Sequence, residues 1–230
     1  MKTIILPDPE RIERCTELLC RVLQEKPEAV VALSAADACL PVYEKLSGLA
    51  RKGVVCLSAA RFFAAAEFEG LTAEDERSCR GRLSAAFSGT GAELTFLTPD
   101  SLDRYDGLIA EAGGLDLAVL GLGINARIGF NEIATPFDSR AHRQKLAPAT
   151  RRELAPLFGG EEQVPVFGLT MGIKTFMEAH EILVTAAGAD RAKAVYNMLY
   201  GRDDSVVPAA FLQIPSRVTA VVDEEAAVLL

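Results

Sequence analysis

Residues 121–132, Gly-Leu-Gly-Ile-Asn-Ala-Arg-Ile-Gly-Phe-Asn-Glu, directly follow the mostly apolar run Leu115–Leu120. A short apolar run of this kind predicts a strand buried on both faces of a parallel sheet. The glycines after it predict a tight turn, where the backbone can approach a ligand closely. A dinucleotide-binding turn would lead into an amphipathic helix, but Thr135-Pro136 soon interrupts the chain. We therefore expect a ligand-binding loop of another kind at this strand end.

Strand-like and helix-like segments alternate on both sides of this stretch. The alternation predicts one three-layer α/β/α domain over residues 1–230, with a mostly parallel, Rossmann-like sheet. Ligands bind such sheets at the carboxyl ends of the strands, where the loops 34–41, 58–63 and 121–132 would meet. The irregular region 125–165 is long enough to predict a lid over that site. The expected strands are Thr3–Leu6, Ala29–Leu33, Val54–Ser58, Leu94–Leu97, Leu115–Leu120, Phe167–Thr170, Ile182–Thr185 and Val218–Val222.

Composition narrows the classes of partner. The formal net charge of −8 disfavours nonspecific binding to nucleic acid or to an anionic membrane, because both would repel the chain. No apolar run is long enough to predict a membrane span. The five cysteines form no Cys-x-x-Cys pattern, so we expect neither a metal site nor a disulfide framework. An odd number of cysteines in a chain of this size fits a reducing, cytoplasmic location.

Four motifs along the chain match one known family. They are Gly-Phe-Asn-Glu at 129–132, Ser139-Arg140 with Lys145-Leu146 and Thr150-Arg151, Gly168-Leu169-Thr170-Met171-Gly172, and Pro208-Ala209-Ala210-Phe211-Leu212-Gln213. Together they make the chain resemble the glucosamine-6-phosphate deaminase/isomerase family. The sequence around residues 115–123 and 168–174 looks closest to that of galactosamine-6-phosphate isomerases. The family is also related to 6-phosphogluconolactonases.

The resemblance implies a reaction on an amino-sugar phosphate that needs no metal or nicotinamide cofactor. In the family, a histidine in an Asp-Gly-His triplet opens the sugar ring. An aspartate in a Met-Asp-Glu-Tyr loop after the third strand then moves a proton between two carbon atoms. Each role requires a side chain that gains and loses a proton near neutral pH.

The residues at these positions have changed. Asn125-Ala126-Arg127 replaces Asp-Gly-His, and a guanidinium stays protonated at physiological pH, so Arg127 cannot act as that base. Aligning Ala59-Ala60-Arg61-Phe62 with Met-Asp-Glu-Tyr puts Ala60 at the aspartate. Only Glu132 is retained, and it is either a carboxylate paired with Arg127 or a partly exposed loop residue.

The expected ligand-binding positions have changed as well. The family's phosphate loop, Pro-Thr-Gly-Ser-Thr-Pro, falls on Ser34–Cys39, where Asp37 would repel a phosphate or would serve as a helix N-cap. The family's lid arginine falls on Pro156, and its later phosphate-binding lysine falls on Arg191. We count Ser34, Asp37, Arg61, Gly123, Asn131 and Arg191 as candidate ligand-binding residues, although Asn131 also suits a turn-bracing role.

Two weaker candidates lie outside these motifs. Cys39, Cys56 and Cys79 could bring a thiol to the pocket, but no histidine is recognisably placed to activate one. His142 falls in a basic loop, beside the region where some deaminases of the family bind regulatory phosphosugars.

Three classes of function follow from this sequence. The first is a sugar-phosphate isomerase that uses Glu132 as its base and an anion site formed by Arg61, Arg127 and Arg191. The second is an enzyme or binding protein for another small ligand, whose carboxylate or phosphate Arg61 and Arg127 would hold. The third is a noncatalytic scaffold or regulator. The substituted proton-handling positions predict that the parental activity is lost or altered. Relatives often form oligomers, so the resemblance allows a homo-oligomer.

Overall fold

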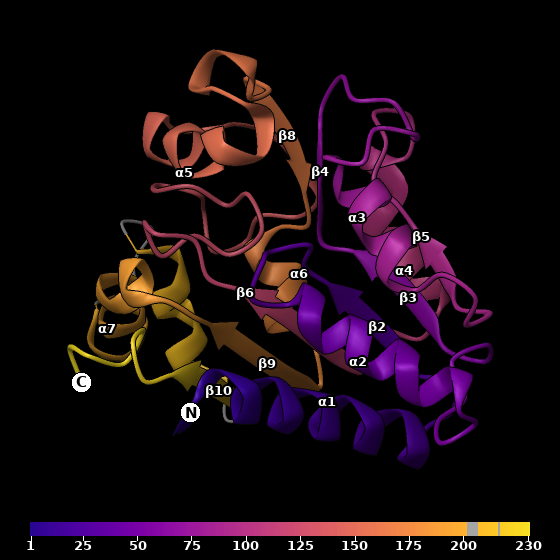
Figure 1. The fold of residues 1–230 in the computed structure, drawn as a ribbon. Helices are drawn as coiled ribbons and strands as arrows, with labels where there is room; N and C mark the ends of the chain where they lie inside the picture. Colours follow the sequence, from indigo (N-terminus) through magenta and orange to yellow (C-terminus); the bar gives the residue numbers. More distant parts are fainter. Residues whose placement is uncertain (202–206, 216) are drawn as a thin grey trace.

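The chain is built around a parallel sheet of seven strands, seen in a computed structural model that describes residues 1–201, 207–215 and 217–230 (Figure 1). Each neighbouring pair in the sheet runs parallel, as the near-continuous apolar strands predict. The strand order is β1 (Lys2–Leu6), β10 (Val218–Asp223), β9 (Glu181–Ala186), β6 (Leu117–Gly121), β2 (Val30–Leu33), β3 (Arg61–Ala64) and β5 (Glu93–Thr95).

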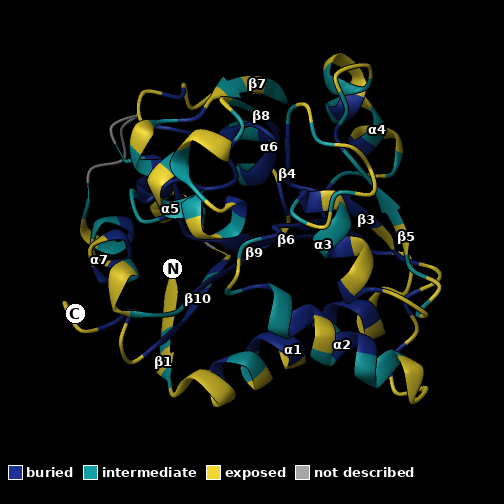
Figure 2. Cartoon of the chain, turned by 45° about the horizontal axis from the view of Figure 1, so that its top comes forward, coloured by how far each residue is buried: buried dark blue, intermediate teal, exposed yellow. Residues whose placement is uncertain are grey.

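Helices cover both faces of this sheet. Alternate strand residues enter opposite cores: Val31 and Leu33 of β2 face one, and Val30 and Ala32 face the other. Figure 2 shows the buried residues between these layers. The expected single-domain α/β fold with a mostly parallel sheet is therefore confirmed. The first core is covered by α1 (Asp8–Glu25), α2 (Leu40–Arg51) and α3 (Cys79–Ala86), and the second by α4 (Tyr105–Glu111), α6 (Ile173–Met177) and α7 (Ala192–Tyr200).

Residues 125–165, predicted as a lid, contain a short helix and one strand of a second, antiparallel sheet. This sheet has the order β4 (Ala66–Phe68), β8 (Phe167–Thr170) and β7 (His142–Lys145). The strand expected at Phe167–Thr170 is present but belongs to this small sheet. Helix α5 (Pro148–Phe158) follows β7 in the chain (Figure 2). The 3₁₀ helices are η1 (Leu102–Arg104), η2 (Glu161–Gln163), η3 (Ala189–Arg191) and η4 (Pro208–Gln213).

The third strand of the central sheet lies later in the chain than expected. Residues 54–58 form no strand: Val54 is 55% exposed, and its N–H donates to the carbonyl of Leu49 at the end of α2. The strand is Arg61–Ala64, whose Phe62 and Phe63 enter opposite cores. Its alanine-rich surroundings hid it, because alanine is depleted in strands while the valines before it are favoured there.

No helix in the described ranges is both long enough and apolar enough to span a membrane.

Candidate functional site

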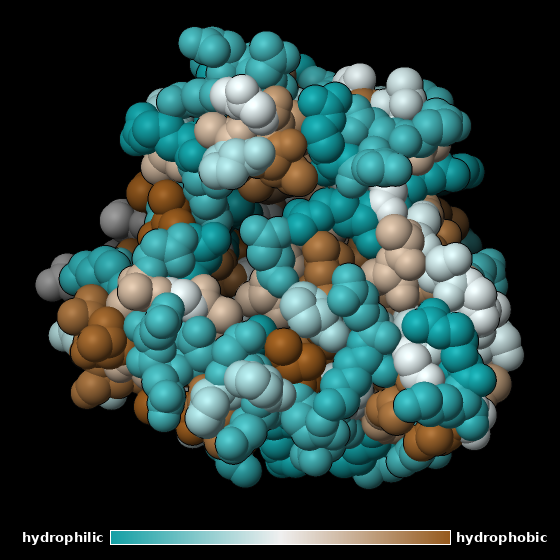
Figure 3. Space-filling view, viewed as in Figure 1, coloured by the Kyte–Doolittle hydropathy of each residue, from teal (hydrophilic) through white to brown (hydrophobic). Residues whose placement is uncertain are grey.

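A cavity of about 240 Å³ lies where the carboxyl ends of β2, β6 and β9 meet. This is the edge of an open α/β sheet at which ligands bind. Helix α5 contributes Glu153 and Leu154 to its wall, and Figure 3 shows the surface hollowed beneath this helix. Of the residues expected at the site, Ser34, Asp37, Gly123, Arg127 and Arg191 line the cavity.

Two arginines and one glutamate form the charged centre of this cavity. Arg191 Nη2 lies 2.7 Å from Glu153 Oε1, and Arg127 Nη2 lies 3.3 Å from Glu153 Oε2. All three side chains are largely buried: Arg191 is 16% exposed, Arg127 is 11% exposed and Glu153 is 9% exposed. Charges this far out of water require partners, and here each arginine finds its partner in the same carboxylate.

Arg127 is held over the glycine turn Gly121-Leu122-Gly123. Its Nη1 donates to the carbonyl of Gly129 at 2.7 Å, and its side chain packs against Gly123. A Cβ on Gly123 would lie 2.5 Å from Arg127 Cγ, so only glycine allows this packing. Arg127 Nε is buried and has no hydrogen-bond partner among the described residues. Because Arg127 Nε packs against Gly123, it is out of reach of the open cavity.

Glu132 does not pair with Arg127, and it is not an exposed loop residue. It is 4% exposed, its Oε2 accepts from Asn125 Nδ2 at 2.8 Å, and its Oε1 accepts from the Ala147 N–H at 3.0 Å. Both expectations for Glu132 are therefore wrong. Ala147 is the N-cap position of α5, so Glu132 ties the 125–132 loop to the helix that covers the cavity.

We expect Glu132→Ala to lower the free energy of unfolding by about 2 to 3 kcal/mol, because it removes two hydrogen bonds to a buried carboxylate. Glu132→Gln keeps the shape and one acceptor oxygen, so it should cost about half as much. Urea unfolding with unchanged m-values would measure both effects. Exposed Glu162→Ala is the matched control. Equal midpoints for Glu132→Ala and Glu162→Ala would contradict this bracing role.

The two asparagines of the loop are both internally bonded. The Asn125 amide donates to Glu132, and Asn125 Oδ1 accepts from the Arg127 N–H at 3.3 Å. Asn131 is fully buried, and its amide donates to the carbonyls of Ile128 at 2.8 Å and Met171 at 2.9 Å. Asn131 braces the loop rather than lining the cavity.

The loop after the third strand is displaced from the register expected for it. Ala60 and Arg61 lie at the amino end of β3, opposite the edge that holds the cavity, and neither lines it. The segment that follows the carboxyl end of β3 is Ala65-Ala66-Glu67-Phe68. In this register, Ala66 rather than Ala60 stands at the aspartate of Met-Asp-Glu-Tyr. The expectation for Ala60 and Arg61 is corrected because β3 begins later than the apolar pattern indicated.

Glu67, which this register matches to the glutamate of the motif, is 9% exposed and points at the start of α3. Its carboxylate accepts from the N–H groups of Phe68 at 2.7 Å, Cys79 at 3.0 Å and Arg80 at 2.8 Å. Burial raises the pKa of the Glu67 carboxyl, while these hydrogen bonds oppose the shift. Glu67 therefore anchors a helix start, where a negative charge is favourable.

The loop matched to the phosphate cradle has become a packed turn. Asp37 does not cap α2, because Cys39 occupies the N-cap position and no side-chain capping bond is present. The Asp37 side chain is 84% exposed and forms an ion pair with Arg82. A Cβ on Gly121 would overlap that of Ala36, so β6 and this loop are in close contact.

Arg11, for which the sequence shows no signal, holds the loop 34–39 in place through its hydrogen bonds. It is 1% exposed, and its Nη1 donates to the carbonyl of Ala38 at 3.0 Å and to Thr185 Oγ1 at 2.6 Å. Its Nε donates to Asp8 Oδ1 at 2.7 Å. The sequence did not point to Glu153 either. Arg11 and Glu153 each lie on a helix rich in charged residues, where nothing local shows that a charged side chain is buried. Only tertiary packing buries them.

The thiols do not supply a nucleophile to the cavity. Burial raises the pKa of Cys39 to about 12 and also raises the pKa of Cys79. The hydrogen bond with Ser58 lowers the pKa of Cys56, but Cys56 is exposed in the segment before β3, at the other edge of the sheet.

We expect Ellman's reagent at pH 8 to react rapidly with Cys56, more slowly with half-buried Cys20, and with Cys15, Cys39 and Cys79 only after denaturation, because the exposed thiolate is the reactive species. Cys56→Ser should remove the fast phase. A fast phase that survives this substitution would mean that a buried thiol reacts.

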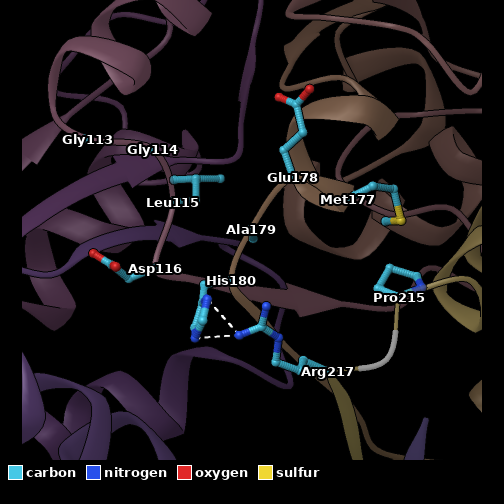
Figure 4. Close-up of a pocket in the computed structure, with 10 residues that line it drawn as sticks. All are labelled: Gly113, Gly114, Leu115, Asp116, Met177, Glu178, Ala179, His180, Pro215 and Arg217. Carbon is cyan, nitrogen blue, oxygen red and sulfur yellow. Dashed lines mark hydrogen bonds between the residues drawn. The ribbon is translucent and has the colours of Figure 1, made fainter.

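A larger hollow of about 560 Å³ lies at the opposite edge of the sheet (Figure 4). It is lined by residues that immediately precede three strands of the sheet. These are Asp116 before β6, His180 before β9 and Arg217 before β10. Arg217 Nη1 lies 2.7 and 2.6 Å from the two ring nitrogens of His180. Despite its size, this hollow is at the wrong end of the strands for the expected site.

Neither His142 nor a metal cluster adds to the cavity. His142 lies on β7, with Nδ1 2.7 Å from the Arg140 carbonyl, and it lines a separate hollow. In the part of the chain that the structure describes, no three His, Cys, Asp or Glu side chains are grouped to hold a metal ion.

Comparisons with known proteins agree on the kind of relative. No family model matches the chain. It is 34% identical to a glucosamine-6-phosphate deaminase of Mycolicibacterium smegmatis, covering 99% of this chain and 92% of that protein. It is 37% identical to one of Rhodopirellula baltica, covering 98% and 94%.

Solved structures give the same result. A monomeric glucosamine-6-phosphate deaminase superimposes with a TM-score of 0.93, at 29% identity and full coverage of both chains. A 6-phosphogluconolactonase from Trypanosoma cruzi superimposes with a TM-score of 0.79 at 16% identity, covering 100% of this chain and 96% of that one, which shows a shared fold. The expected likeness to galactosamine-6-phosphate isomerases in particular stays a prediction.

Proposed function

Because this chain belongs to the glucosamine-6-phosphate deaminase family, we propose that it keeps the family's fold and ligand cavity but does not catalyse the parental reaction. It acts instead as a noncatalytic binding protein for a small polar ligand of the sugar class. The observation that carries this proposal is the set of side chains at the three proton-handling positions, Ala66, Asn125 and Arg127.

None of these three side chains can take up and return a proton near neutral pH. Alanine has no ionisable group, and the asparagine amide donates and accepts hydrogen bonds without titrating. The Arg127 guanidinium stays protonated, and its Nη atoms are bonded to Gly129 and Glu153. Ring opening and carbon-to-carbon proton transfer both lack a base at the expected positions.

Glu132 is a poor substitute base for an isomerase. A general base must reach the proton that it removes, at about 2.6 to 3.2 Å. Glu132 does not line the cavity, and both its carboxylate oxygens accept hydrogen bonds from Asn125 and Ala147. These contacts favour a structural role and argue against the isomerase alternative.

The cavity itself supports binding rather than a purely structural scaffold. A scaffold would be expected to fill the old site with Phe62, Phe63 and Arg127. Phe62 and Phe63 instead pack into the two cores on either side of the sheet. The open volume of about 240 Å³, lined by polar and charged residues such as Ser34, Arg127 and Asp190, suits one small polar molecule.

The experiment is an assay of ammonia release and of isomerisation with glucosamine-6-phosphate and galactosamine-6-phosphate. The M. smegmatis relative serves as the positive control. We expect turnover at least about 10⁴-fold slower than that of the relative. Sustained turnover that Glu132→Gln abolishes would overturn the proposal in favour of the Glu132-dependent isomerase.

A further inference from the structure

Glu153 lies where the resemblance places the phosphate of a substrate. It bridges Arg191, which stands at the family's phosphate-binding lysine, and Arg127, which stands at its histidine. Its Oε2 also lies 3.3 Å from the Ile124 N–H, so the carboxylate accepts from the backbone of the glycine turn as well. A carboxylate bound by two guanidinium groups and a backbone N–H has the contacts that a bound anion would have.

Charge around the cavity is nearly balanced without a ligand. Arg127 and Arg191 face Glu153, and exposed Asp190 adds a second carboxylate, 2.8 Å from Arg191 Nη1. Asp37 also lines the cavity, although it pairs with Arg82. A phosphate dianion would enter a site whose arginines are already neutralised, and a buried carboxylate would repel it.

Helix α5 supplies this carboxylate and no compensating cation to the cavity. Pro156 stands on α5 where the resemblance implies the lid arginine, and Glu153 and Leu154 are the α5 residues that line the site. The same helix that would bring a positive charge to the substrate therefore brings a negative one. Helix α5 is fixed in this position by Glu132, which accepts from Ala147 at its N-cap.

We propose that Glu153 is a specificity-determining residue, a resident anion that makes this cavity reject phosphorylated sugars and accept a sugar-sized ligand without a phosphate. Ser34, Asp37 and Asp190, which also line the cavity, can form hydrogen bonds with the hydroxyl groups of such a ligand. This inference rests on the proposed function, since it concerns what the noncatalytic cavity binds.

The test is isothermal titration calorimetry at fixed ionic strength with glucosamine-6-phosphate and with glucosamine. The unmodified protein should bind the phosphorylated sugar no more tightly than glucosamine. Glu153→Gln keeps the shape of the side chain and frees both arginines. It should bind glucosamine-6-phosphate at least about tenfold more tightly, while glucosamine binding changes by less than about threefold. Exposed Glu162→Gln, just after α5, is the matched control and should behave like the unmodified protein.

Two outcomes would overturn the inference. One is an unmodified protein that binds glucosamine-6-phosphate at least about tenfold more tightly than glucosamine, a result that needs no variant to fold. The other is a folded Glu153→Gln protein with no gain in affinity for the phosphorylated sugar, because no anion subsite would then exist behind Glu153. If the unmodified protein binds the phosphosugar at least about tenfold more tightly than glucosamine but releases no ammonia, this inference alone is contradicted, whereas ammonia release contradicts the proposed function.

Discussion

Purified protein will release ammonia from glucosamine-6-phosphate at least about 10⁴-fold more slowly than the M. smegmatis relative under the same conditions. A positioned acid or base contributes about 10² to 10⁴ in rate, and this chain lacks more than one such group. The expected deficit is therefore a product of separate losses, at Ala66 and at Arg127. Sensitive detection at high protein concentration is needed to measure the residual rate.

The pH dependence of that residual rate checks the same prediction. A histidine base gives a rate that changes as the imidazole titrates, near its ordinary pKa of about 6.5. Arginine does not titrate in the accessible range, so between about pH 6 and 9 we expect no change in rate beyond that caused by the phosphate and amino groups of the substrate. A bell-shaped profile with substantial turnover would mean that another group has taken over the proton transfer.

Arg11→Ala will lower the free energy of unfolding by about 3 to 5 kcal/mol, the largest effect that we expect from a single side chain. Arg11 is 1% exposed, and removing it leaves the Ala38 carbonyl and the buried Thr185 hydroxyl without their donor. It also opens a cavity beneath α1, because the long Arg11 side chain is almost fully buried. The loss should appear as a lower urea midpoint and a lower melting temperature.

Two further variants separate these causes. Arg11→Lys keeps the charge, but a single ammonium cannot reach Asp8, Ala38 and Thr185 together, so about half of the loss should persist. Arg14→Ala is the matched control on the same helix, since Arg14 is 38% exposed and pairs with the exposed Glu17. Its cost should be below about 1 kcal/mol. Similar costs for Arg11→Ala and Arg14→Ala would refute the argument.

Arg11 also connects stability to the candidate site. The loop that it holds through Ala38 forms one wall of the cavity, and Thr185 lies near the carboxyl end of β9 on another side. A loosened loop would change the distance between the start of α2 and Arg191. We therefore expect Arg11→Lys, which should still fold, to weaken ligand binding without contacting the ligand.

Most of the fold could be predicted from the sequence because its strands carry a strong local signal. The apolar runs at β2, β6, β9 and β10 can only be buried on both faces, which requires helices on each side. The exception, β3, shows the limit of this signal. Its two phenylalanines are surrounded by alanines. The segment just before it, Val54–Ser58, has the higher β-propensity, so the strand was predicted there.

The later position of β3 also changes which residue corresponds to the family's aspartate. The sequence placed the missing carboxylate at Ala60, whereas the strand bounds place it at Ala66. The conclusion that the aspartate is absent survives, because both positions hold alanine, but Arg61 leaves the site altogether. The sequence correctly predicted an alanine at the aspartate position, but it predicted the wrong alanine. The register of β3 depends on where this strand pairs in the sheet and not on its composition.

The sequence by itself determined the family, the kind of sheet and the exchange of the proton-handling residues, because motifs and apolar periodicity are local properties of the chain. Only the tertiary structure decided what those exchanges mean. It buries Glu132 against Asn125 and Ala147, and it brings Glu153 from α5 onto Arg127 and Arg191. These partners lie 7 to 38 positions apart. A charged side chain on a helix looks solvent-exposed in sequence, and its burial and its partner are set by which elements pack around it.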